Sequence, residues 1–319
     1  MPHDSTMRLG LCCINTDLRK KGIFSSRTVR LATIKAKGLD HVKDLALKNI
    51  EDTKTILREN VNVGIFVFRL SSEVFPHINN EKCGGYDLDF AKESLKSLGE
   101  VARECNQRIT AHPGQFNVLG SPNEEAVKNT IRELNTQAEI FDLMEMDQDS
   151  VMVIHGGGVY GDIDAAKQRW VDNFGLLSES AQKRLVLENC EKCYNIQDCL
   201  DISHAVKEKY GFFLPVVIDS HHYDCYNLLH PQNTLTNIDD LVPLVIETWE
   251  ERQIRMKVHI SEQGSGKIGH HSDYVEKIPE YFLDVVNVFG IPLDLMIEAK
   301  AKEKSIFHLY DNFPELFVL

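Results

Sequence analysis

LPVVIDSHH, at residues 214–222, joins an apolar run to a cluster of polar, ionisable side chains. The stretch begins with a short apolar run without polar alternation, which is typical of a parallel strand covered on both faces. The run ends in Asp219, and His222 follows in the next loop. Because the reactive groups of parallel α/β folds gather at the carboxyl ends of their strands, the stretch predicts both a buried strand and a place for chemistry.

Similar apolar runs, rich in Val, Ile, Leu and Met, occur along the whole chain. We expect strands at residues 8–13, 62–71, 108–113, 150–156, 184–189, 214–220, 255–261 and 293–299. The segments between them carry apolar residues every three to four positions, which is typical of amphipathic helices. The clearest helical segments are residues 38–60, 88–105, 123–144 and 271–290.

The alternation of strand and helix predicts an α/β fold, a single (β/α)8 TIM barrel over residues 1–319, with a flexible N-terminus at residues 1–7. The helix at 123–144 should begin with Ser121 as its cap and Pro122 in its first turn. A doubly wound open sheet is the alternative fold, but no GxGxxG follows the first strand. Long polar segments are expected to form functional loops at the mouth, at residues 71–89, 222–237, 262–273 and 300–310.

Imidazole and carboxylate groups stand at the ends of these strands. In isolation, a buried His is more often a hydrogen-bonded core residue, and a Glu at a strand end usually caps a helix or forms a salt bridge. Eight such groups at one barrel mouth would repel each other or stay badly desolvated unless divalent cations compensated them. The set therefore predicts a metalloenzyme with a cluster of ions. Its members are His112, His155, Glu188, Asp219, His222, His259, His271 and Glu298.

The two histidine pairs leave choices open. Asp219 ends a strand and His222 starts the following loop, so the two can serve different ions of one cluster. His221 is either an outer partner of a ligand or a mere neighbour. Of His270 and His271 we prefer His271, because it opens HSD ahead of a predicted helix.

Lys257 and His259 are two residues apart on one strand, so both point to the same face. A lysine directed into a metal-lined barrel is unusual. One interpretation is a salt bridge to Glu188 or Glu298. The other is a lysine carbamylated so that it binds metal, and the sequence leaves both open.

Composition limits the class of protein. The 319 residues, 43% of them hydrophobic, can bury a full core in one barrel. No run of about 18 apolar residues occurs, so no membrane partner is expected, and MPHDSTMRLG lacks the apolar core of a secretion signal. The lone CxxC of Cys190 and Cys193 is interpreted as reduced, packed thiols, with a zinc or redox role as the alternative. We expect a soluble intracellular protein, in the cytoplasm, the nucleus or a viral factory.

A net charge of −13 argues against a general nucleic-acid surface. Between Asn15 and Gly38, however, Asp17 is the only acid in a basic segment that follows the first strand and should lie at the same mouth as the ligands. A solvated surface is the usual interpretation of a charge run, but this position beside a metal site favours contact with a polyanion equally. The bases of the segment are Arg19, Lys20, Lys21, Arg27, Arg30, Lys35 and Lys37.

The chain resembles the UV-damage endonucleases over nearly its whole length. The matching stretches are RLGLCCIN, FRLSSEVFP, HPGQF, VIHGGG, LENC, DSHH, KVHIS, HHSDY and MIEAKAKE. Each stretch alone is weak evidence, but their combination is specific. The chain is also distantly similar to endonuclease IV and the xylose isomerases, which share a barrel with a metal-lined mouth. HPGQF and KVHIS favour the UV-damage group.

The resemblance implies a chemistry and a set of ligands. Family members are TIM barrels that nick DNA immediately 5′ of UV photoproducts, namely cyclobutane pyrimidine dimers and 6-4 photoproducts, and leave a 3′-hydroxyl. They bind up to three divalent ions, commonly Mn²⁺, with Mg²⁺, Co²⁺ or Zn²⁺ as alternatives. Glu188, Lys257 and His259 would be catalytic, Lys257 matching a lysine that can be carbamylated. The implied ion ligands are His112, His155 and Glu188 for one ion, Glu188, Asp219, His259 and Glu298 for a second, and His222 and His271 for a third.

The resemblance also implies contacts with DNA. Gln115 and Phe116 of HPGQF match a pair that probes the damaged strand, and Asn15 matches an active-site asparagine near the lesion. Phe116 and Leu11 stand where tyrosines occur in relatives. Phe116 can still stack or wedge against an unstacked base pair, whereas Leu11 cannot stack. Backbone phosphates would be held by the basic segment, foremost by Arg19, Lys20 and Lys21.

The sequence therefore predicts a DNA-repair endonuclease that acts on UV-damaged double-stranded DNA, with its oligomeric state open and a monomer favoured. Three alternatives stay open: an apurinic-site endonuclease, a sugar isomerase on the same scaffold, and a non-catalytic protein that binds lesions. The basic segment and the many histidines disfavour the isomerase. The intact ligand set disfavours a protein that only binds.

Overall fold

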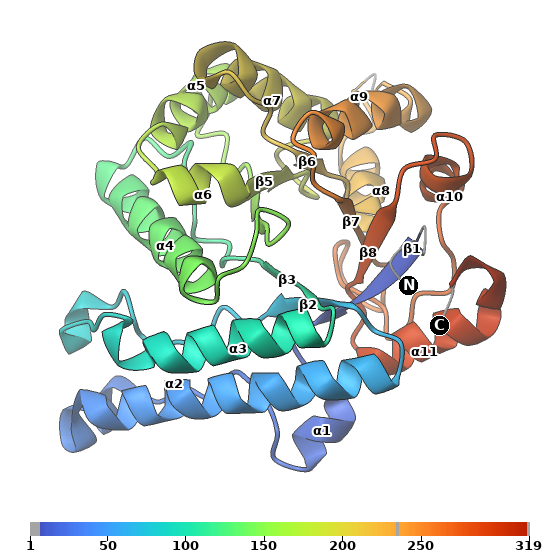
Figure 1. Ribbon diagram of the computed structural model, residues 1–319. Helices are drawn as coiled ribbons and strands as arrows, with labels where there is room; N and C mark the ends of the chain where they lie inside the picture. Colours follow the sequence, from blue (N-terminus) through green and yellow to red (C-terminus); the bar gives the residue numbers. More distant parts are fainter. Residues whose placement is uncertain (1–6, 234–235, 318–319) are drawn as a thin grey trace.

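Eight parallel strands form the centre of the computed structural model, which describes residues 7–233 and 236–317 (Figure 1). Their order in the sheet is β6-β5-β4-β3-β2-β1-β8-β7, so every strand lies beside its neighbours along the chain. This order is what repeated right-handed βαβ crossovers produce. The strands are β1 (Met7–Cys12), β2 (Val67–Leu70), β3 (Arg108–Ala111), β4 (Met152–His155), β5 (Leu185–Glu188), β6 (Val216–Val217), β7 (Met256–Ile260) and β8 (Leu293–Ile297).

The ring closes between β6 and β7 without a continuous ladder. β6 is only two residues long. Beyond its end, Asp219 and His259 form an isolated parallel bridge, and the amide of His259 donates to the carbonyl of Ile218 at 2.9 Å. The sheet is thus a nearly closed barrel, which confirms the predicted (β/α)8 fold. The gap between β6 and β7, where the barrel closes, lies at Asp219 and His259, two of the predicted metal ligands.

Helices surround the strands on the outside of the barrel (Figure 1). The longest is α2, which bends at Gly38, where a φ of 80° lies in the left-handed region that favours glycine. In the described part of the chain, no helix combines the length and apolar character needed to cross a membrane. The helices are α1 (Thr16–Lys20), α2 (Leu31–Asn62), α3 (Lys92–Glu104), α4 (Glu124–Leu143), α5 (Ile163–Phe174), α6 (Glu179–Arg184), α7 (Ile196–Tyr210), α8 (Ser220–Leu229), α9 (Ile238–Glu250), α10 (Glu280–Asn287) and α11 (Glu303–Asn312), with 3-10 turns η2 (Glu81–Cys83), η3 (Asp89–Ala91) and η4 (Pro314–Leu316).

The segment of β7 supplies side chains to successive layers of the barrel interior. Arg255, just before the strand, donates to Asp294 at the N-terminal end, at 2.7 Å. Lys257 is fully buried and pairs in register with the same Asp294. His259 reaches the carboxyl end, where it contacts Glu188. Because strand residues two apart share a face, the alternate residues of one strand connect the floor of the barrel to its mouth.

Two predicted boundaries near the N-terminus are wrong. Met7 belongs to β1 and is buried, so it is not part of the flexible N-terminus expected at residues 1–7, while residues 1–6 lie outside the described residues. The strand expected from residue 62 begins at Val67. The reason is that α2 continues to Asn62 and a short turn separates the two elements.

Helix ends also differ from the prediction. Asn123, not Ser121, caps α4, since its side chain accepts hydrogen bonds from the amides of Glu125 and Ala126, whereas the Ser121 hydroxyl accepts from the amide of Asn123 at 3.1 Å. Of the residues 271–290 that were expected to form one helix, only those of α10 are helical. Pro279 stands at the N-cap of α10, where a proline is tolerated because it lies before the helix interior.

Two segments expected to be loops are partly helical. Residues 222–237 contain most of α8, and residues 300–310 contain most of α11. α8 begins directly at the strand end because Asp219 is also its N-cap, accepting from the amide of His222 at 2.7 Å. A residue interpreted only as a ligand thus also starts a helix.

Candidate metal centre

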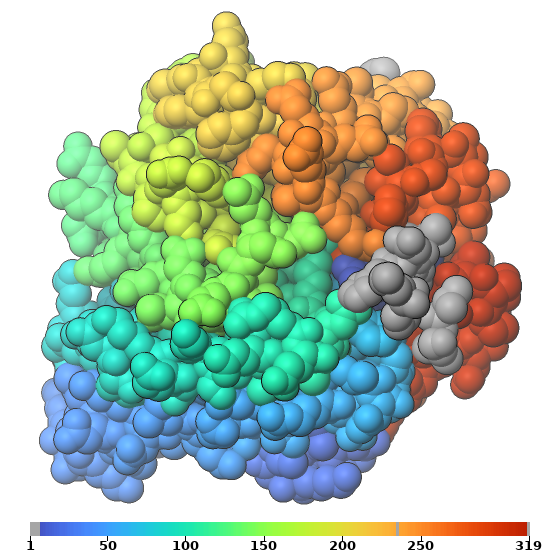
Figure 2. Space-filling view, viewed as in Figure 1, coloured from blue at the N-terminus to red at the C-terminus, as the bar shows by residue number. Residues whose placement is uncertain are grey.

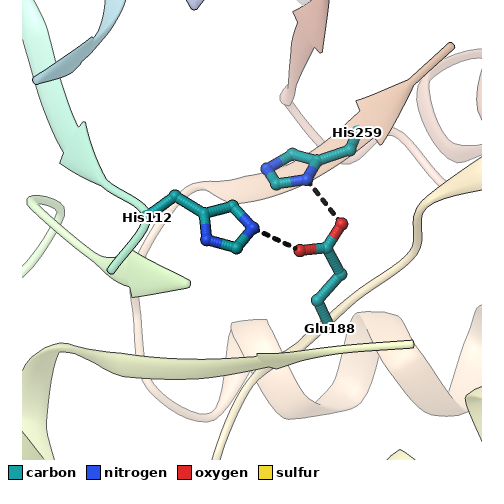
Figure 3. A group of neighbouring side chains, drawn as sticks. All are labelled: His112, Glu188 and His259. Atoms are coloured by element: carbon teal, nitrogen blue, oxygen red, sulfur yellow. Dashed lines mark hydrogen bonds and ion pairs between the residues drawn. The ribbon is translucent and has the colours of Figure 1, made fainter. Parts of the chain in front are cut away.

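Glu188, the last residue of β5, has both carboxylate oxygens engaged at the barrel mouth. Nε2 of His112 lies 2.9 Å from Oε2, and Nδ1 of His259 lies 2.7 Å from Oε1. His112, just after β3, and His259 of β7 point their rings at this carboxylate (Figure 3). Since residues distant in sequence meet here, the convergence is a consequence of the parallel barrel.

Two further histidines approach the same carboxylate. Nε2 of His155 lies 3.7 Å from Oε2 of Glu188, and Nδ1 of His222 lies 3.6 Å from Oε1. The ligand atoms of these three residues lie within 4.8 Å of one another. Nδ1 of His155 is buried and has no hydrogen-bond partner among the described residues. This second group therefore shares Glu188 with the first and could hold a separate ion.

Asp219, His259 and Glu298 form a third group, whose ligand atoms also lie within 4.8 Å of one another. Nδ1 of His259 is 3.3 Å from Oε1 of Glu298. Oδ2 of Asp219 is buried and lacks a hydrogen-bond partner among the described residues. A buried carboxylate oxygen without a donor is unfavourable, so this oxygen fits one that coordinates a cation.

The remaining predicted ligand lies at the edge of the centre. Nδ1 of His271 is 3.9 Å from Oε2 of Glu298, and His271 is absent from the three compact groups. Its ring lies against that of His221, with centroids 5.7 Å apart. His221 in turn lies 3.6 Å from the thiol of Cys225, so it is an outer neighbour of the ligand set.

Asn189, which follows Glu188, holds two ligands in place. Its side-chain amide donates to the backbone carbonyl of Asp219 at 3.1 Å, and its side-chain oxygen accepts from the Asp219 amide at 2.8 Å. Its backbone carbonyl lies 3.1 Å from Nδ1 of His222. Such outer contacts fix the orientation of metal ligands. Asn189 stands within LENC but was not among the predicted site residues.

Burial and mutual charge set the protonation of the centre. Burial raises the pKa of Asp219 to about 7 against the attraction of His222, with Glu188 and Glu298 adding to the rise. Burial would also raise the pKa of Glu188, but the hydrogen bonds that it accepts from His112 and His259 help to hold it well below its ordinary value. Burial lowers the pKa of His259 to about 3, which favours the neutral, ligating form. Burial would lower the pKa of His222, but the carboxylates of Asp219, Glu188 and Glu298 raise it to about 9. Carboxylates crowded around imidazoles in this way fit divalent cations.

Two basic side chains approach the same imidazole. Nζ of Lys257 contacts Nε2 of His259, and Nη2 of Arg69 lies 3.1 Å from that nitrogen while donating to Oε1 of Glu298. Burial, with repulsion from Arg69, lowers the pKa of Lys257 to about 7. The salt bridge considered between Lys257 and Glu188 or Glu298 is not present among the described residues. Arg69 pairs with Glu298, and His259 with Glu188. Sequence reasoning missed Arg69, which lies in β2 within FRLSSEVFP.

The predicted DNA contacts lie around the mouth. Phe116 follows β3 and is 82% exposed, with Gln115 exposed beside it. Phe116 lines a groove of about 550 Å³, and Lys82 lines the same groove.

Asn15 is buried, and its side-chain oxygen caps α1 by accepting from the amide of Leu18 at 2.9 Å. Asn15 therefore has a structural role as the N-cap of α1, whether or not it also contacts DNA.

The basic segment divides into exposed bases and bases anchored in the fold. Arg19, Lys20 and Lys21 are exposed at the end of α1. Lys20 pairs with Asp17 at 2.9 Å across an exposed surface, where such a pair contributes little. Arg27 is different, because it is half-buried and bonds the carboxylate of Asp52 at 2.6 Å. Arg27 therefore stabilises the fold, while the first three bases are accessible.

Comparison with known proteins identifies the relationship. The model of the family described as UV-endonuclease UvdE matches residues 7–317. The chain belongs to this family. It is 36% identical over 316 residues to a putative UV-damage endonuclease of Acanthamoeba polyphaga mimivirus, covering 98% of this chain and 92% of that one. It is 36% identical over 314 residues to the UV-damage endonuclease of Schizosaccharomyces pombe, covering 95% of this chain but 50% of that longer one.

Solved structures agree with the family. The crystal structure of SacUVDE has a TM-score of 0.81 at 30% identity and covers 97% of this chain and 99% of that one. An L-ribulose 3-epimerase has a TM-score of 0.56 at 12% identity, covering 97% of this chain and 86% of that one, and shares the fold alone. The family membership makes this chain a DNA endonuclease of UV-damage repair.

Proposed function

We propose that the protein nicks double-stranded DNA immediately 5′ of cyclobutane pyrimidine dimers and 6-4 photoproducts, leaves a 3′-hydroxyl and depends on divalent cations. The observation that carries the proposal is the position of Glu188. Glu188 belongs to two of the three compact ligand groups, and the third group shares His259 with the first. A cluster of ions bridged in this way is suited to cleaving a phosphodiester.

The donor set fits up to three ions, with Mn²⁺ as the first choice and Mg²⁺, Co²⁺ or Zn²⁺ as alternatives. Imidazoles mixed with carboxylates, without thiolates, suit such metals. The chemistry that bound divalent ions would supply is activation of a water molecule and neutralisation of the charge that gathers on the phosphate. The distances between ligand atoms define three groups: His112 with Glu188 and His259, His155 with Glu188 and His222, and Asp219 with His259 and Glu298. His271 lies beside Glu298 and would add a ligand at the edge of the third group.

The chain's own residues orient this centre. Glu188 bridges two groups, and Asn189 fixes Asp219 and His222 beside it. Lys257, whose pKa is about 7, is partly a neutral amine at neutral pH, which is the form that adds carbon dioxide to give a carbamate. As an amine, Lys257 would orient the ring of His259 through its contact with Nε2. As a carbamate, it would add an oxygen ligand beside His259.

Recognition would rest on weakened base stacking. A lesion that distorts the duplex lowers the cost of extruding its bases, which is about a few kcal/mol. Phe116 is exposed enough to fill the resulting gap, with Gln115 beside it. Asn15 lies near the end of β1, and Arg19, Lys20 and Lys21 follow it on an accessible surface where backbone phosphates could bind.

Incubation with three duplexes tests the proposal. Each contains the same sequence, either UV-irradiated, carrying one abasic site, or intact, and each is incubated with Mn²⁺ or EDTA. We expect nicking of the irradiated duplex only with metal, at the bond 5′ of the lesion, with a product that a DNA polymerase can extend. Cutting confined to the abasic duplex would establish an apurinic-site endonuclease instead. Tight binding of the irradiated duplex without cleavage under any metal would establish a lesion-binding protein.

A further inference from the structure

Lys302, at the N-cap of α11, has a backbone conformation that favours glycine. Its φ is 55° and its ψ is −122°. These angles are those of the first central residue of a type II′ turn, a position that glycine occupies without steric cost. The turn is closed by the amide of Lys304, which donates to the carbonyl of Ala301 at 3.1 Å. A lysine here is strained, and strain of this kind concentrates at functional sites.

The residue after Lys302 anchors one end of this turn. Glu303 is buried, and its carboxylate accepts from the amides of Thr16 at 2.7 Å and Asp17 at 3.2 Å. These bonds tie α11 to the start of α1, and the space-filling view shows the red C-terminal segment beside blue N-terminal ones (Figure 2). Lys302 is thereby fixed beside the basic segment that follows β1.

The residues before Lys302 are held from the other side, at the barrel mouth. The amide of Lys300 donates at 3.1 Å to the carbonyl of Ser272, which directly follows the candidate ligand His271. Lys300 in turn stands shortly after Glu298, a member of the third ligand group. Both anchors therefore keep the turn next to the metal centre, and its strained backbone cannot relax without breaking one of them.

The ammonium of Lys302 lies near this centre without an acidic partner. It is close enough to act electrostatically on the thiol of Cys12 at the end of β1, as Arg69 and Glu298 also do. The half-buried side chain nevertheless forms no ion pair or hydrogen bond with the described residues. Glu298 already pairs with Arg69. A cation placed in this way is suited to an anionic group that arrives with the substrate.

We propose that Lys302 binds a backbone phosphate of the DNA beside the metal centre and so positions the strand for cleavage. A phosphate oxygen supplies the acceptor that the ammonium lacks, since lysine binds phosphate as a point charge. The strain then has a reason, because the anchored turn keeps a cationic side chain where glycine would fit the backbone better. The inference rests on the proposed function only in that DNA is the substrate, and it concerns a residue outside the three ligand groups.

Two variants that differ in backbone strain provide the test. Lys302→Ala removes the ammonium but keeps a Cβ, whereas Lys302→Gly removes both. Affinity of the full-length protein for irradiated and for intact duplex is measured in EDTA over a range of salt concentrations. Both variants should bind each duplex about tenfold more weakly, as expected for the loss of one hydrogen bond to a charged group. Both should also reduce the slope of log affinity against log salt concentration by about 1.

Stability separates strain from binding. Lys302→Gly should melt at a higher temperature than Lys302→Ala, because a Cβ at this φ is unfavourable. Lys302→Arg keeps the charge and should retain the wild-type salt slope. Lys183→Ala is the matched control, since it removes an exposed lysine that ends α6 just before β5, at the opposite end of the barrel, and pairs only with Glu179. It should bind DNA like wild type.

Wild-type affinity and slope in both Lys302→Ala and Lys302→Gly would overturn the proposal, even if the wild-type protein cuts irradiated DNA. A lower melting temperature for Lys302→Gly than for Lys302→Ala would also overturn it, because the turn would then carry no strain. Weaker binding of intact duplex by both variants supports it whichever lesion the wild type cuts. Failure of this inference and failure of the proposed function are thus distinguishable.

Discussion

The backbones of Asp219 and His259 pair with each other where the barrel closes, and their side chains belong to the same ligand group. The seam between β6 and β7 is therefore part of the candidate metal centre. Cations bound here would stabilise the folded protein, because ligands that bind only the native state shift the equilibrium toward it. Removal of metal should accordingly affect the stability of the barrel as well as its activity.

Asp219 can be tested separately as a ligand and as a helix cap. Asp219→Asn keeps an oxygen for the amide of His222 but removes the charge, so it should lower metal content and cleavage with little loss of stability. Asp219→Ala also removes the cap and should cost about 1 kcal/mol more in the free energy of unfolding. Elemental analysis and chemical denaturation in EDTA measure the two effects. Equal stability of both variants would show that the cap contributes nothing.

Glu188→Gln should reduce cleavage of irradiated DNA to below about 1% of the wild-type rate, since even residues that only support metal ligands contribute about 10–100-fold. The fold should persist, which circular dichroism measures. Glu191→Gln, a neighbouring and half-buried carboxylate outside the ligand groups, is the control and should retain activity. Substantial activity in Glu188→Gln would remove this residue from the centre of the mechanism.

Arg69 should act as a positioning residue for Glu298 and His259. Arg69→Gln is expected to slow cleavage about 10–100-fold, as for other outer partners of metal ligands. Arg69→Lys restores the charge but not the two-pronged donor, so it should recover only part of the activity. The metal dependence of the rate provides the decisive readout. An unchanged metal requirement together with lower thermal stability would assign Arg69 a purely structural role.

Phe116→Ala should weaken the preference for damaged over intact DNA about tenfold, since stacking of an aromatic side chain on a base contributes about 1–3 kcal/mol. The side chain is 82% exposed, so the melting temperature should hardly change. Competition binding with irradiated and intact duplexes measures the preference. If metal affinity fell together with lesion preference, Phe116 would be supporting the centre rather than probing DNA.

Asp294 should control acid stability independently of metal. Burial would raise its pKa, but Arg8, Arg108 and Arg255 hold it well below the ordinary value. Its folded pKa is thus lower than its unfolded pKa of about 3.9, so its stabilisation is complete above that pH and is lost as the pH falls toward the folded pKa. Asp294→Asn, which removes the one charge that Arg8, Arg108 and Arg255 share, should cost about 3–5 kcal/mol at pH 7. Urea unfolding in EDTA from pH 7 down to acid should show a smaller loss for this variant than for wild type.

The basic segment is tested by salt dependence. Neutralising Arg19, Lys20 and Lys21 together should reduce the slope of log affinity against log salt concentration by up to about 3, because each base that neutralises one DNA phosphate adds about one unit to the slope. Arg27 is unsuitable for this purpose, because its loss would also disturb Asp52. An unchanged slope in the triple variant would return these three residues to ordinary solvated surface.

Much of the fold could be predicted because its signals are local. Each strand is a short apolar run, and the ligands stand at the ends of such runs, so the barrel rule alone brings His112, His155 and Glu188 together. The start of α4 could not be predicted as easily. Ser121 and Asn123 are both good capping residues, and only the backbone geometry decides that Asn123 accepts from the first turn.

Residues that act across the barrel were harder to recognise. Arg69 lies in the middle of an apolar strand, where an arginine has no local explanation, and its partners Glu298 and His259 are distant in sequence. The same holds for the three arginines around Asp294. Pairing of buried charges depends on which strands become neighbours and in what register, and composition carries no information about either.

The alternate residues of the β7 segment limit how this protein can evolve. Arg255, Lys257 and His259 contribute to the floor, the middle and the mouth of the barrel from one continuous segment. Single substitutions there would alter one layer at a time. An inserted or deleted residue between them would instead turn every side chain on one side of the change to the opposite face, because side-chain direction in a strand reverses with each residue. Length variation among descendants of this chain should consequently be tolerated in the connecting loops and excluded from β7.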